Sequence, residues 1–544
     1  MEESRAPEVT EVTDSGLFVR NATGLVRGMS QRASVVLNFI PGHPTQTLSA
    51  VLFYFLAAAF PGSNMYLALL LVVPMTLSFS YAFGLLTQMI PRSGGDYMLV
   101  SRVIHPLVGL VSSFCMSVAG FLSNAFFGLA FVIYALGPSC VAIGNIGGYS
   151  GLSSFGQDIS AGKWWQFFLG SAMIALSCLI HLSGWRWMMR FLNGLFWVVT
   201  GGMILTVLTL LVRGKDTFAK GFDSFAGAGE YQGTIDRAVK AGIDLSPSFS
   251  FSQTIGLVAG LATVSIYCYW STFVGGELRQ ASTLKTANNM ARGGVLGMIV
   301  VAIFGTIILS SIGESFIRAA QNGNLPEGLP LTNPTYIFLT AASVNNTLFA
   351  IILALSYVVF WPLICWLSLL QPTRMLFAYA FDGLLPKSFT KTTRGGAPIV
   401  CVLISGALSI LVLLWATQNQ ASLFKVLAFA TLIQLIAMAL VGLSGLLAPS
   451  RRPELYRASS SQKTLGGIPL VQVAGLGCIL TAAFLWIVFL TKPALGIAAS
   501  GRGEFLLWAI GTMAAGVLFY FIARAVRASQ GVNVDRAFAE IPPE

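Results

Sequence analysis

The sequence has few charged residues, and this shortage decides its class. Only 10% of the 544 residues are Asp, Glu, Lys or Arg, whereas 55% are hydrophobic, and the mean hydropathy is +0.76. A soluble domain carries about 25% charged residues, so the composition excludes a soluble protein. Between Arg32 and Arg92 there is no charged side chain at all. The chain also lacks the alternating strands of an outer-membrane barrel, which leaves an integral membrane protein built of helices.

Clusters of cysteine or histidine are missing as well. The seven cysteines lie mostly in apolar stretches and show no Cys-x-x-Cys spacing, so we expect neither disulfides nor a metal site. The three histidines are scattered at His43, His105 and His181. A membrane enzyme needs catalytic side chains that converge at membrane depth, so we expect no enzyme, no metal and no cofactor.

Charge-free intervals predict twelve membrane-spanning helices, because each interval holds the roughly 20 apolar residues that cross a bilayer. The first two spans share 33–91, divided at residues 60–64, and the third covers about 106–136, followed by a Gly/Ser-rich polar loop. The other intervals are 164–185, 191–212, 245–276, 293–313, 328–373, 395–424, 426–450, 464–491 and 505–523.

Basic residues predict how the chain is oriented. An even number of spans places both termini on one side, and basic loops mark the cytoplasm. With the N-terminus inside, about two thirds of the 32 Lys and Arg fall on the inner side. The net charge of +11 therefore reflects orientation in a plasma or inner membrane, and no nucleic-acid partner is expected. Residues 1–32 show no signal-peptide pattern.

The stretch 38–46 interrupts the first predicted span. Pro41, Gly42 and Pro44 stand where a membrane helix should be continuous. An unpaired backbone group in hydrocarbon costs several kcal/mol, so broken backbone persists only against protein or a water-filled cavity. We predict a broken helix whose gap faces a substrate. A simple proline kink is the alternative.

A second interruption is predicted in the sixth span, between Val264 and Glu277, where small residues, aromatics and a glycine pair crowd together. Spans 1–5 and 6–10 form two units, and an odd number of helices inverts the second. Both interruptions then fall in the first helix of a unit, which is the pattern of a transporter site near the midplane. Half-helix N-termini attract an anion and half-helix C-termini a cation, so a zwitterion suits both.

The apolar cores of the spans contain almost no ionisable residue. A polyamine pocket would require buried carboxylates, so a neutral or zwitterionic amino acid is favoured. Tyr267, Tyr269, Trp270 and Phe273 are candidates for a side-chain pocket. Ordinary interhelical hydrogen bonding explains the other candidate lining residues equally well. These are Ser123, Asn124, Thr200, Tyr357, Trp361 and Gln434.

Three loop motifs match a known pattern. Pro91-Arg92-Ser93-Gly94-Gly95-Asp96-Tyr97 is similar to P-x-S-G-G-x-Y, and Phe273-Val274-Gly275-Gly276-Glu277 is similar to F-x-G-x-E. Residues 373–386, which include Arg374 and Asp382, are similar to S-R-x-x-x-A-x-x-R-D-G-x-x-P. Over about 21–447 the chain thus resembles the amino acid–polyamine–organocation (APC) superfamily of amino acid permeases. The resemblance implies an all-α, twelve-span leucine-transporter fold, with 5+5 inverted repeats and two extra helices.

The resemblance also implies which residues hold the substrate, because in that family the two breaks bind the carboxylate and amino groups of the amino acid. The matching positions are Pro41, Gly42, His43 and Pro44, with Tyr267, Trp270, Ser271, Thr272 and Phe273. Typical members carry a Gly-Ser-Gly-like first break, whereas this chain has Ile-Pro-Gly-His-Pro at residues 40–44. The lysine of some proton-coupled members and the Ser/Thr pair of the second sodium site have no counterpart, so coupling to H⁺ or Na⁺ stays unassigned.

Charged motif residues are predicted to form a gate at the cytoplasmic rim. Gly94 and Gly95 permit a tight turn there. Ion pairs among the charged motif residues would latch the gate, and ordinary solvated charge is the alternative. These charged residues are Arg92, Asp96, Arg102, Glu277, Arg374 and Asp382.

His43 is a candidate carrier of a coupling proton, with a structural role as the alternative.

The sequence therefore predicts a secondary active amino acid transporter that works by alternating access. The alternatives are a carrier of another small solute (an amine or a polyamine), a nutrient sensor, or a major facilitator carrier, whose long middle loop is missing. Expected partners are the amino acid and membrane lipid, and the oligomeric state is undetermined. The expected segments are 1–32 (cytoplasmic), 33–213 (first repeat), 214–250 (extracellular loop), 251–450 (second repeat), 451–527 (last two spans) and 528–544 (cytoplasmic tail).

Overall fold

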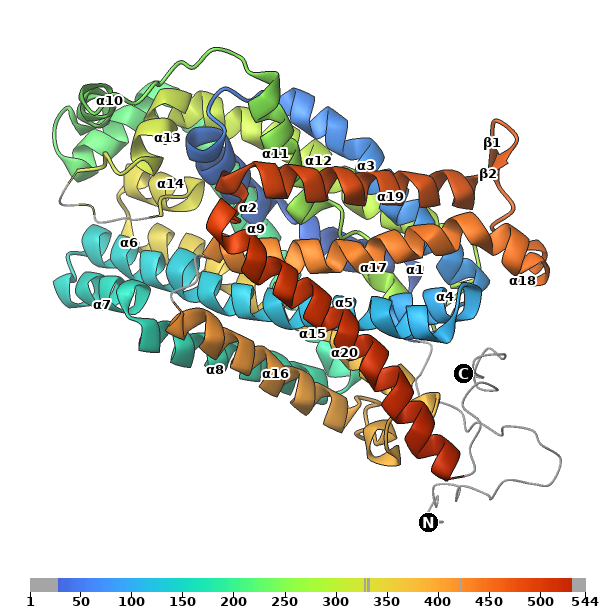
Figure 1. Ribbon diagram of the computed structural model, residues 1–544. Helices are drawn as coiled ribbons and strands as arrows, with labels where there is room; N and C mark the ends of the chain where they lie inside the picture. Colours follow the sequence, from blue (N-terminus) through green and yellow to red (C-terminus); the bar gives the residue numbers. More distant parts are fainter. Residues whose placement is uncertain (1–27, 327–328, 330–332, 420–422, 531–544) are drawn as a thin grey trace.

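The computed structural model describes residues 28–326, 329, 333–419 and 423–530, so most of the expected terminal segments 1–32 and 528–544 lies outside them. Within the described residues, eleven helices are long and apolar enough to cross a membrane. Most of them run roughly parallel in a thick bundle (Figure 1). The protein is therefore a predominantly helical, multi-pass integral membrane protein.

Long helices make up most of the bundle. Eight of them are single helices: α3 (Met65–Met89), α8 (Lys163–Leu182), α9 (Trp185–Ala226), α12 (Lys285–Ile312), α15 (Thr347–Phe381), α16 (Ile399–Gln418), α17 (Leu423–Arg451) and α19 (Leu470–Thr491). Two more include a 3₁₀ turn: α11 (Phe251–Ser265) with the residues up to Phe273, and α20 (Arg502–Ser529) with η7 (Ala499–Gly501) before it. The eleventh is α5 (Pro106–Ala130), which continues through η3 (Phe131–Leu136) into α6 (Gly137–Gly147). In Figure 1, α20 crosses the bundle obliquely over α5.

The first predicted span is a chain of four short helices, which is why it is not among the eleven. They are α1 (Gln31–Phe39), the 3₁₀ turn η1 (Ile40–Gly42), α2 (Pro44–Leu48) and the π-helix η2 (Ser49–Ala59). His43, at φ −58° and ψ 127°, leaves the helical region between η1 and α2. Pro44 lacks an amide hydrogen and suits the first position of the restarted helix. The interruption predicted at 38–46 is present.

The second interruption lies beside the first. Helix α11 ends at Ser265, residues 266–269 are not helical, and the 3₁₀ helix η4 (Trp270–Phe273) follows. Gly42 packs against the backbone here, since a Cβ atom at that position would lie 3.1 Å from the Val264 carbonyl oxygen. The two breaks therefore come into contact through their main chains, and the lack of a side chain at Gly42 favours this close approach.

Shorter helices form a cap at one end of the bundle. We use this name for the last part of α9 beyond Gly214 together with α10 (Glu230–Lys240), α13 (Glu314–Gln321) and α14 (Tyr336–Val344) (Figure 1). Tyr231 stacks on Phe316 with ring centroids 4.6 Å apart, and Phe218 and Phe222 pack edge-on against Phe316. The segment expected as an extracellular loop, 214–250, thus contains helices that share an aromatic core.

The Gly/Ser-rich stretch after Leu136 is helical, so the prediction of a polar loop there was wrong. Helix α6 packs against α7 (Ser150–Ala161) through glycines. A Cβ atom on Gly156 would lie 2.6 Å from the carbonyl oxygen of Gly137. Small residues permit close helix packing in membranes, and here that effect outweighs their low helix propensity.

The opposite end of the bundle, which we call the basic end, carries α4 (Gly95–Val103), α18 (Pro453–Ala458) and η5 (Lys387–Thr390). A short hairpin there pairs β1 (Thr464–Leu465) antiparallel with β2 (Ile468–Pro469). At the cap end, η6 (Pro493–Leu495) and η7 (Ala499–Gly501) connect α19 to α20. Figure 1 shows α4, α18 and the hairpin at the end of the bundle that lies away from the cap.

Candidate functional site

A cavity of about 60 Å³ lies on the cap side of the two breaks. One wall comes from the restarted first span, which contributes Gln46, Ser49, Ala50, Phe53, Tyr54 and Phe55. The first five positions are separated by three, one, three and one residues, which places them on one face of a helix. Phe55 borders the cavity from outside this face. The restart at Pro44 therefore turns a single stripe of the first span towards the cavity.

The other walls come from distant parts of the chain. Thr263 and Val264 reach the cavity from the last turn of α11, while Tyr357 and Trp361 reach it from α15. The third predicted span contributes Phe126 and Tyr134, and α17 contributes Leu423, Phe424 and Leu427. Gln321, Pro334 and Thr335 approach from the cap. The cavity is thus enclosed by both interrupted spans, three long helices and the cap.

The lining is largely aromatic and carries no formal charge. Among the described residues, those that line the cavity include no Asp, Glu, Lys, Arg or His. Two buried polar atoms of the lining, Trp361 Nε1 and Thr335 Oγ1, have no hydrogen-bond partner in the protein. A buried polar group without a partner is costly, so both atoms are suited to bind a ligand or a water molecule.

An aromatic stack closes the cavity on the side of the α19–α20 connection. The rings of Tyr54 and Phe424 stack with centroids 3.6 Å apart and an interplanar angle of 11°. The Tyr54 hydroxyl donates to the carbonyl oxygen of Ala494 at 3.0 Å. This stack joins the first span to α17, and the helices that follow the two repeats hold it in place.

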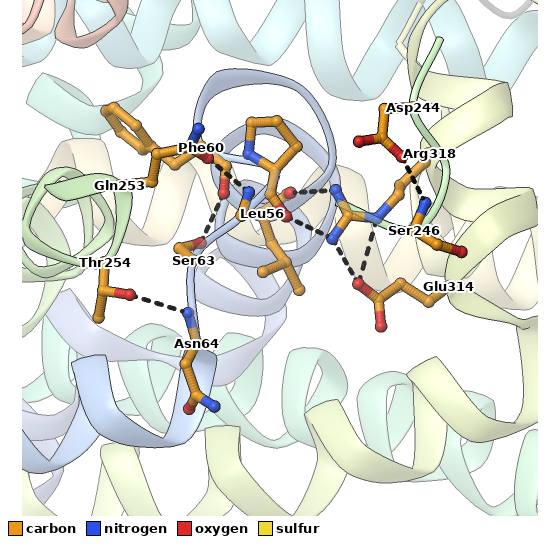
Figure 2. A network of polar contacts seen from close by, with 12 residues as sticks. Leu56, Phe60, Ser63, Asn64, Asp244, Ser246, Gln253, Thr254, Glu314 and Arg318 are labelled. Carbon is orange, nitrogen blue, oxygen red and sulfur yellow. Dashed lines mark hydrogen bonds and ion pairs between the residues drawn. The ribbon is translucent and has the colours of Figure 1, made fainter. Parts of the chain in front are cut away.

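The cap is fastened to the end of the first span by Arg318 of α13, as Figure 2 shows. Its guanidinium donates to the carbonyl oxygens of Leu56, at 3.1 Å, and Pro61, at 2.7 Å, and pairs with Glu314. The Arg318 side chain is only 3% exposed. A cation is favourable at a helix C-terminus, where carbonyls lack helical partners, and Leu56 lies in the last turn of η2.

Two buried ion pairs hold the basic end together. Arg102 Nη2 lies 2.7 Å from Asp382 Oδ2, and these side chains are 2% and 1% exposed. The Tyr97 hydroxyl also donates to Asp382, at 2.6 Å. Arg374 Nε lies 2.9 Å from Glu277 Oε1. Removal of one partner from such a buried pair costs about 3–5 kcal/mol, because the other charge is left uncompensated.

The predicted gate residues lie together at this end. Gly94 and Gly95 have positive φ angles of 131° and 60°, and the Gly94 amide donates to the Phe273 carbonyl at 3.3 Å. A Cβ atom on Gly95 would lie 2.3 Å from the Phe273 ring. The structure therefore brings the first and second loop motifs into direct contact through a turn that requires glycine.

The two remaining charged residues of the first motif have different surroundings. Asp96 is buried and accepts a hydrogen bond from the Ser112 hydroxyl at 2.5 Å. Burial raises the pKa of Asp96 from its usual 3.8 to about 7. Arg92 is half-buried, and its guanidinium donates to the Pro91 carbonyl at 3.1 Å.

Of the predicted substrate-binding and lining side chains, Tyr357 and Trp361 line the cavity. Pro41, Gly42 and Pro44 form the first break itself. His43 is buried beside it: its Nε2 lies 3.1 Å from Thr200 Oγ1, and its Nδ1 accepts from the Thr45 amide at 3.2 Å. The imidazole therefore faces α9 and caps α2, and it is not part of the cavity lining.

The predicted residues of the second break lie between the cavity and the basic end. Trp270, Ser271, Thr272 and Phe273 are buried in η4. The Ser271 amide donates to the side-chain oxygen of Asn38 at 3.1 Å, which ties this segment to the first span.

Two more predicted residues contact neighbouring helices. The Tyr267 hydroxyl donates to Thr431 of α17 at 3.3 Å, and the Asn124 amide donates to Ser409 of α16 at 3.0 Å. Neither residue is among those that line the cavity. Their roles in substrate binding stay predictions.

Sequence reasoning missed most of the cavity wall. The residues overlooked include Gln46, Ser49, Phe53 and Tyr54, although their helical spacing is visible in the sequence. The stripe is visible only if a restart after Pro44 is assumed. The opposite face of the helix is apolar as well, so periodicity alone does not distinguish the two faces.

Comparison with known proteins places this chain in a family. The model of the family described as "Amino acid permease" matches residues 33–522, which is most of the chain and includes both breaks. The comparison with curated proteins returns no match. The chain therefore belongs to the amino acid permease family of the APC superfamily.

Proposed function

We propose that the protein is a secondary transporter that moves neutral or zwitterionic amino acids across the membrane by alternating access. Family membership supports an amino acid as cargo and a transporter rather than an enzyme. The observation that carries the proposal is the uncharged cavity beside two interrupted spans. A zwitterion needs dipoles and free backbone groups rather than a net charge, and helix breaks supply both.

The arrangement of helices supports the leucine-transporter fold. If the broken run from Gln31 to Ala59 is counted as a span, the eleven candidates become twelve. The first unit then covers 33–213 and the inverted unit 251–450, with α19 and α20 appended. Each unit begins with its interrupted helix, as paired repeats of this type require.

The asymmetry of the two ends supports a transport cycle. With the basic end in the cytoplasm, the buried pairs Arg102–Asp382 and Arg374–Glu277 close the inner side, while the cavity lies on the outer side. The first span, α3, α11 and α12 would rock against α5, α8, α15 and α16. Inward opening then requires the two ion pairs to separate.

Reconstitution tests this function. Purified protein in liposomes is expected to take up labelled neutral amino acids with saturable kinetics. Imposed proton or sodium gradients, applied separately, will identify the coupling ion. A complete lack of saturable flux with all twenty amino acids would overturn the proposal. Substrate-induced thermal stabilisation without any flux would favour a nutrient sensor instead.

His43 is the proposed carrier of a coupling proton, and a structural role is the alternative. Both of its ring nitrogens already contact protein groups, which supports the structural role. The test is the pH dependence of uptake by a His43→Gln variant, with Thr200→Val as the matched control that removes the same contact from the other side. Loss of pH dependence in His43→Gln alone would support proton coupling, whereas equal effects of both variants would support the structural role.

A further inference from the structure

We infer that the cavity selects amino acids with a large apolar side chain, such as leucine, methionine or phenylalanine. This inference rests on the proposed function, because it names the substrate class for the same site. It depends on three features of the cavity: which groups form its walls, where its polar groups lie, and what closes it.

Aromatic and aliphatic groups form most of the walls. Phe53 on the first span faces the same space as Phe126 on α5 and Tyr357 on α15, and Phe424 covers it from α17. The residues come from four different elements, so the apolar surface surrounds the space instead of covering one side. A small side chain would leave much of this surface without a partner, whereas a large one buries it and displaces water.

Polar side chains lie at both ends of the cavity: Gln321 and Thr335 approach from the cap, and three others lie at the breaks. Gln46 and Ser49 occupy the first turns after the break in the first span, and Thr263 and Val264 occupy the last turn of α11. Tyr54, at the far end of the stripe, lies on the order of 10 Å further along the helix. Only the breaks also offer main-chain groups without helical partners, so a bound amino acid would place its polar end there and its side chain towards Phe53 and Phe424.

The closure of the cavity is also apolar. The side chain would end against the stacked rings of Tyr54 and Phe424. A lysine or glutamate side chain would there lose its hydration without gaining an ion partner among the lining residues of the described chain, which strongly disfavours its binding. The stack thus excludes charged side chains and accepts apolar ones.

Ala50 limits the size of the space. It lies in the middle of the stripe, between Ser49 and Phe53, and is half-buried. An Ala50→Leu substitution fills part of the cavity without adding a polar group. Ala58 lies on the same π-helix, is also half-buried, and is not part of the lining, so Ala58→Leu is the matched control.

The experiment is competition of labelled leucine uptake in proteoliposomes by single unlabelled amino acids. Leucine, methionine and phenylalanine should compete at least about tenfold better than glycine or alanine, since a few methylenes in an apolar pocket give at least that ratio. Aspartate, lysine and putrescine should not compete. If leucine itself is not transported, alanine or glycine is used as the label.

The variants test the assignment of the walls. Ala50→Leu should weaken competition by phenylalanine about tenfold or more and that by alanine much less, and Ala58→Leu should change neither. If Ala50→Leu does not fold, Phe126→Leu, which enlarges the cavity, should instead improve competition by tryptophan. An equal loss for all substrates in Ala50→Leu would contradict the placement of the side chain in this cavity.

The outcomes separate this inference from the proposed function. Transport that prefers glycine, alanine or a charged amino acid would overturn the inference and leave an amino acid transporter. Lack of saturable transport for every amino acid would overturn both.

Discussion

At the scale of single residues, Gly42 is the position where the two interrupted spans meet. A Cβ atom there would lie 3.1 Å from the Val264 carbonyl oxygen. Because Gly42 has no side chain, the two main chains can approach closely. This contact involves both breaks, so the proline-rich stretch alone does not reveal it.

A Gly42→Ala substitution is expected to push the breaks apart and to lower both uptake and stability. The cost of forced overpacking is about 1–3 kcal/mol. Thermal unfolding in detergent and uptake in liposomes measure the two effects. Gly194→Ala is the control: it lies in α9 with nothing within 4 Å of the added methyl group, so it should be neutral or slightly stabilising. Equal behaviour of the two variants would contradict the contact between breaks.

Asp96 is a second residue whose environment makes a prediction. Its pKa of about 7 in the folded protein exceeds the usual 3.8, so the folded state binds the proton more tightly than the unfolded state does. Stability should therefore fall as the pH rises from about 4 to about 7. An Asp96→Asn variant lacks this ionisation and should lose less stability over the same range. Unfolding temperatures of both proteins in a pH series check this, and parallel curves would refute it.

At the scale of elements, the cap depends on one arginine. Arg318→Met keeps the aliphatic stem but removes the donors to the Leu56 and Pro61 carbonyls. Buried acceptors left unpaired cost about 1–3 kcal/mol. Hydrogen–deuterium exchange should therefore rise in α13 and in residues 56–64, while Lys240→Met, at an exposed position of α10, should have no effect there. Unchanged exchange in Arg318→Met would mean that aromatic packing alone holds the cap.

The elements differ in how well the sequence predicted them. The long apolar helices follow from charge-free intervals, because hydrocarbon permits little else. Helices α6, α7 and α10 were missed, since their glycines and charges are typical of loops in water. Contacts with distant residues make these segments helical. Helices α6 and α7 pack closely at Gly137 and Gly156, and α10 packs on the aromatic cluster around Phe316. No local pattern contains that information.

At the scale of the whole molecule, two buried ion pairs join separate helices at the basic end. Glu277→Gln leaves the buried Arg374 charge uncompensated, so we expect a loss of about 3–5 kcal/mol and faster hydrogen exchange at residues 93–97 and 273–278. The partly exposed pair Arg237–Glu230 is the control, because Glu230→Gln should cost less than about 1 kcal/mol.

A double variant isolates the contribution of the pair. Glu277→Gln combined with Arg374→Gln should cost less than the sum of the two single changes, because the second change removes the uncompensated charge. Strictly additive losses would show that the two residues act independently and would remove their role as a latch.

The sequence by itself determined the class of the protein, the positions of the two interruptions and the motifs that meet at the basic end. These follow from local rules: charge is excluded from lipid, proline and glycine break helices, and loop turns need glycine. Only the tertiary structure decided that His43 faces α9 and that Trp270 to Phe273 lie between the cavity and the basic end. The same holds for the aromatic residues that surround the cavity, which are Phe53, Phe126, Tyr357 and Phe424. The direction in which a buried side chain points depends on neighbours far away in the chain, and an apolar helix offers several equivalent faces until those neighbours are in place.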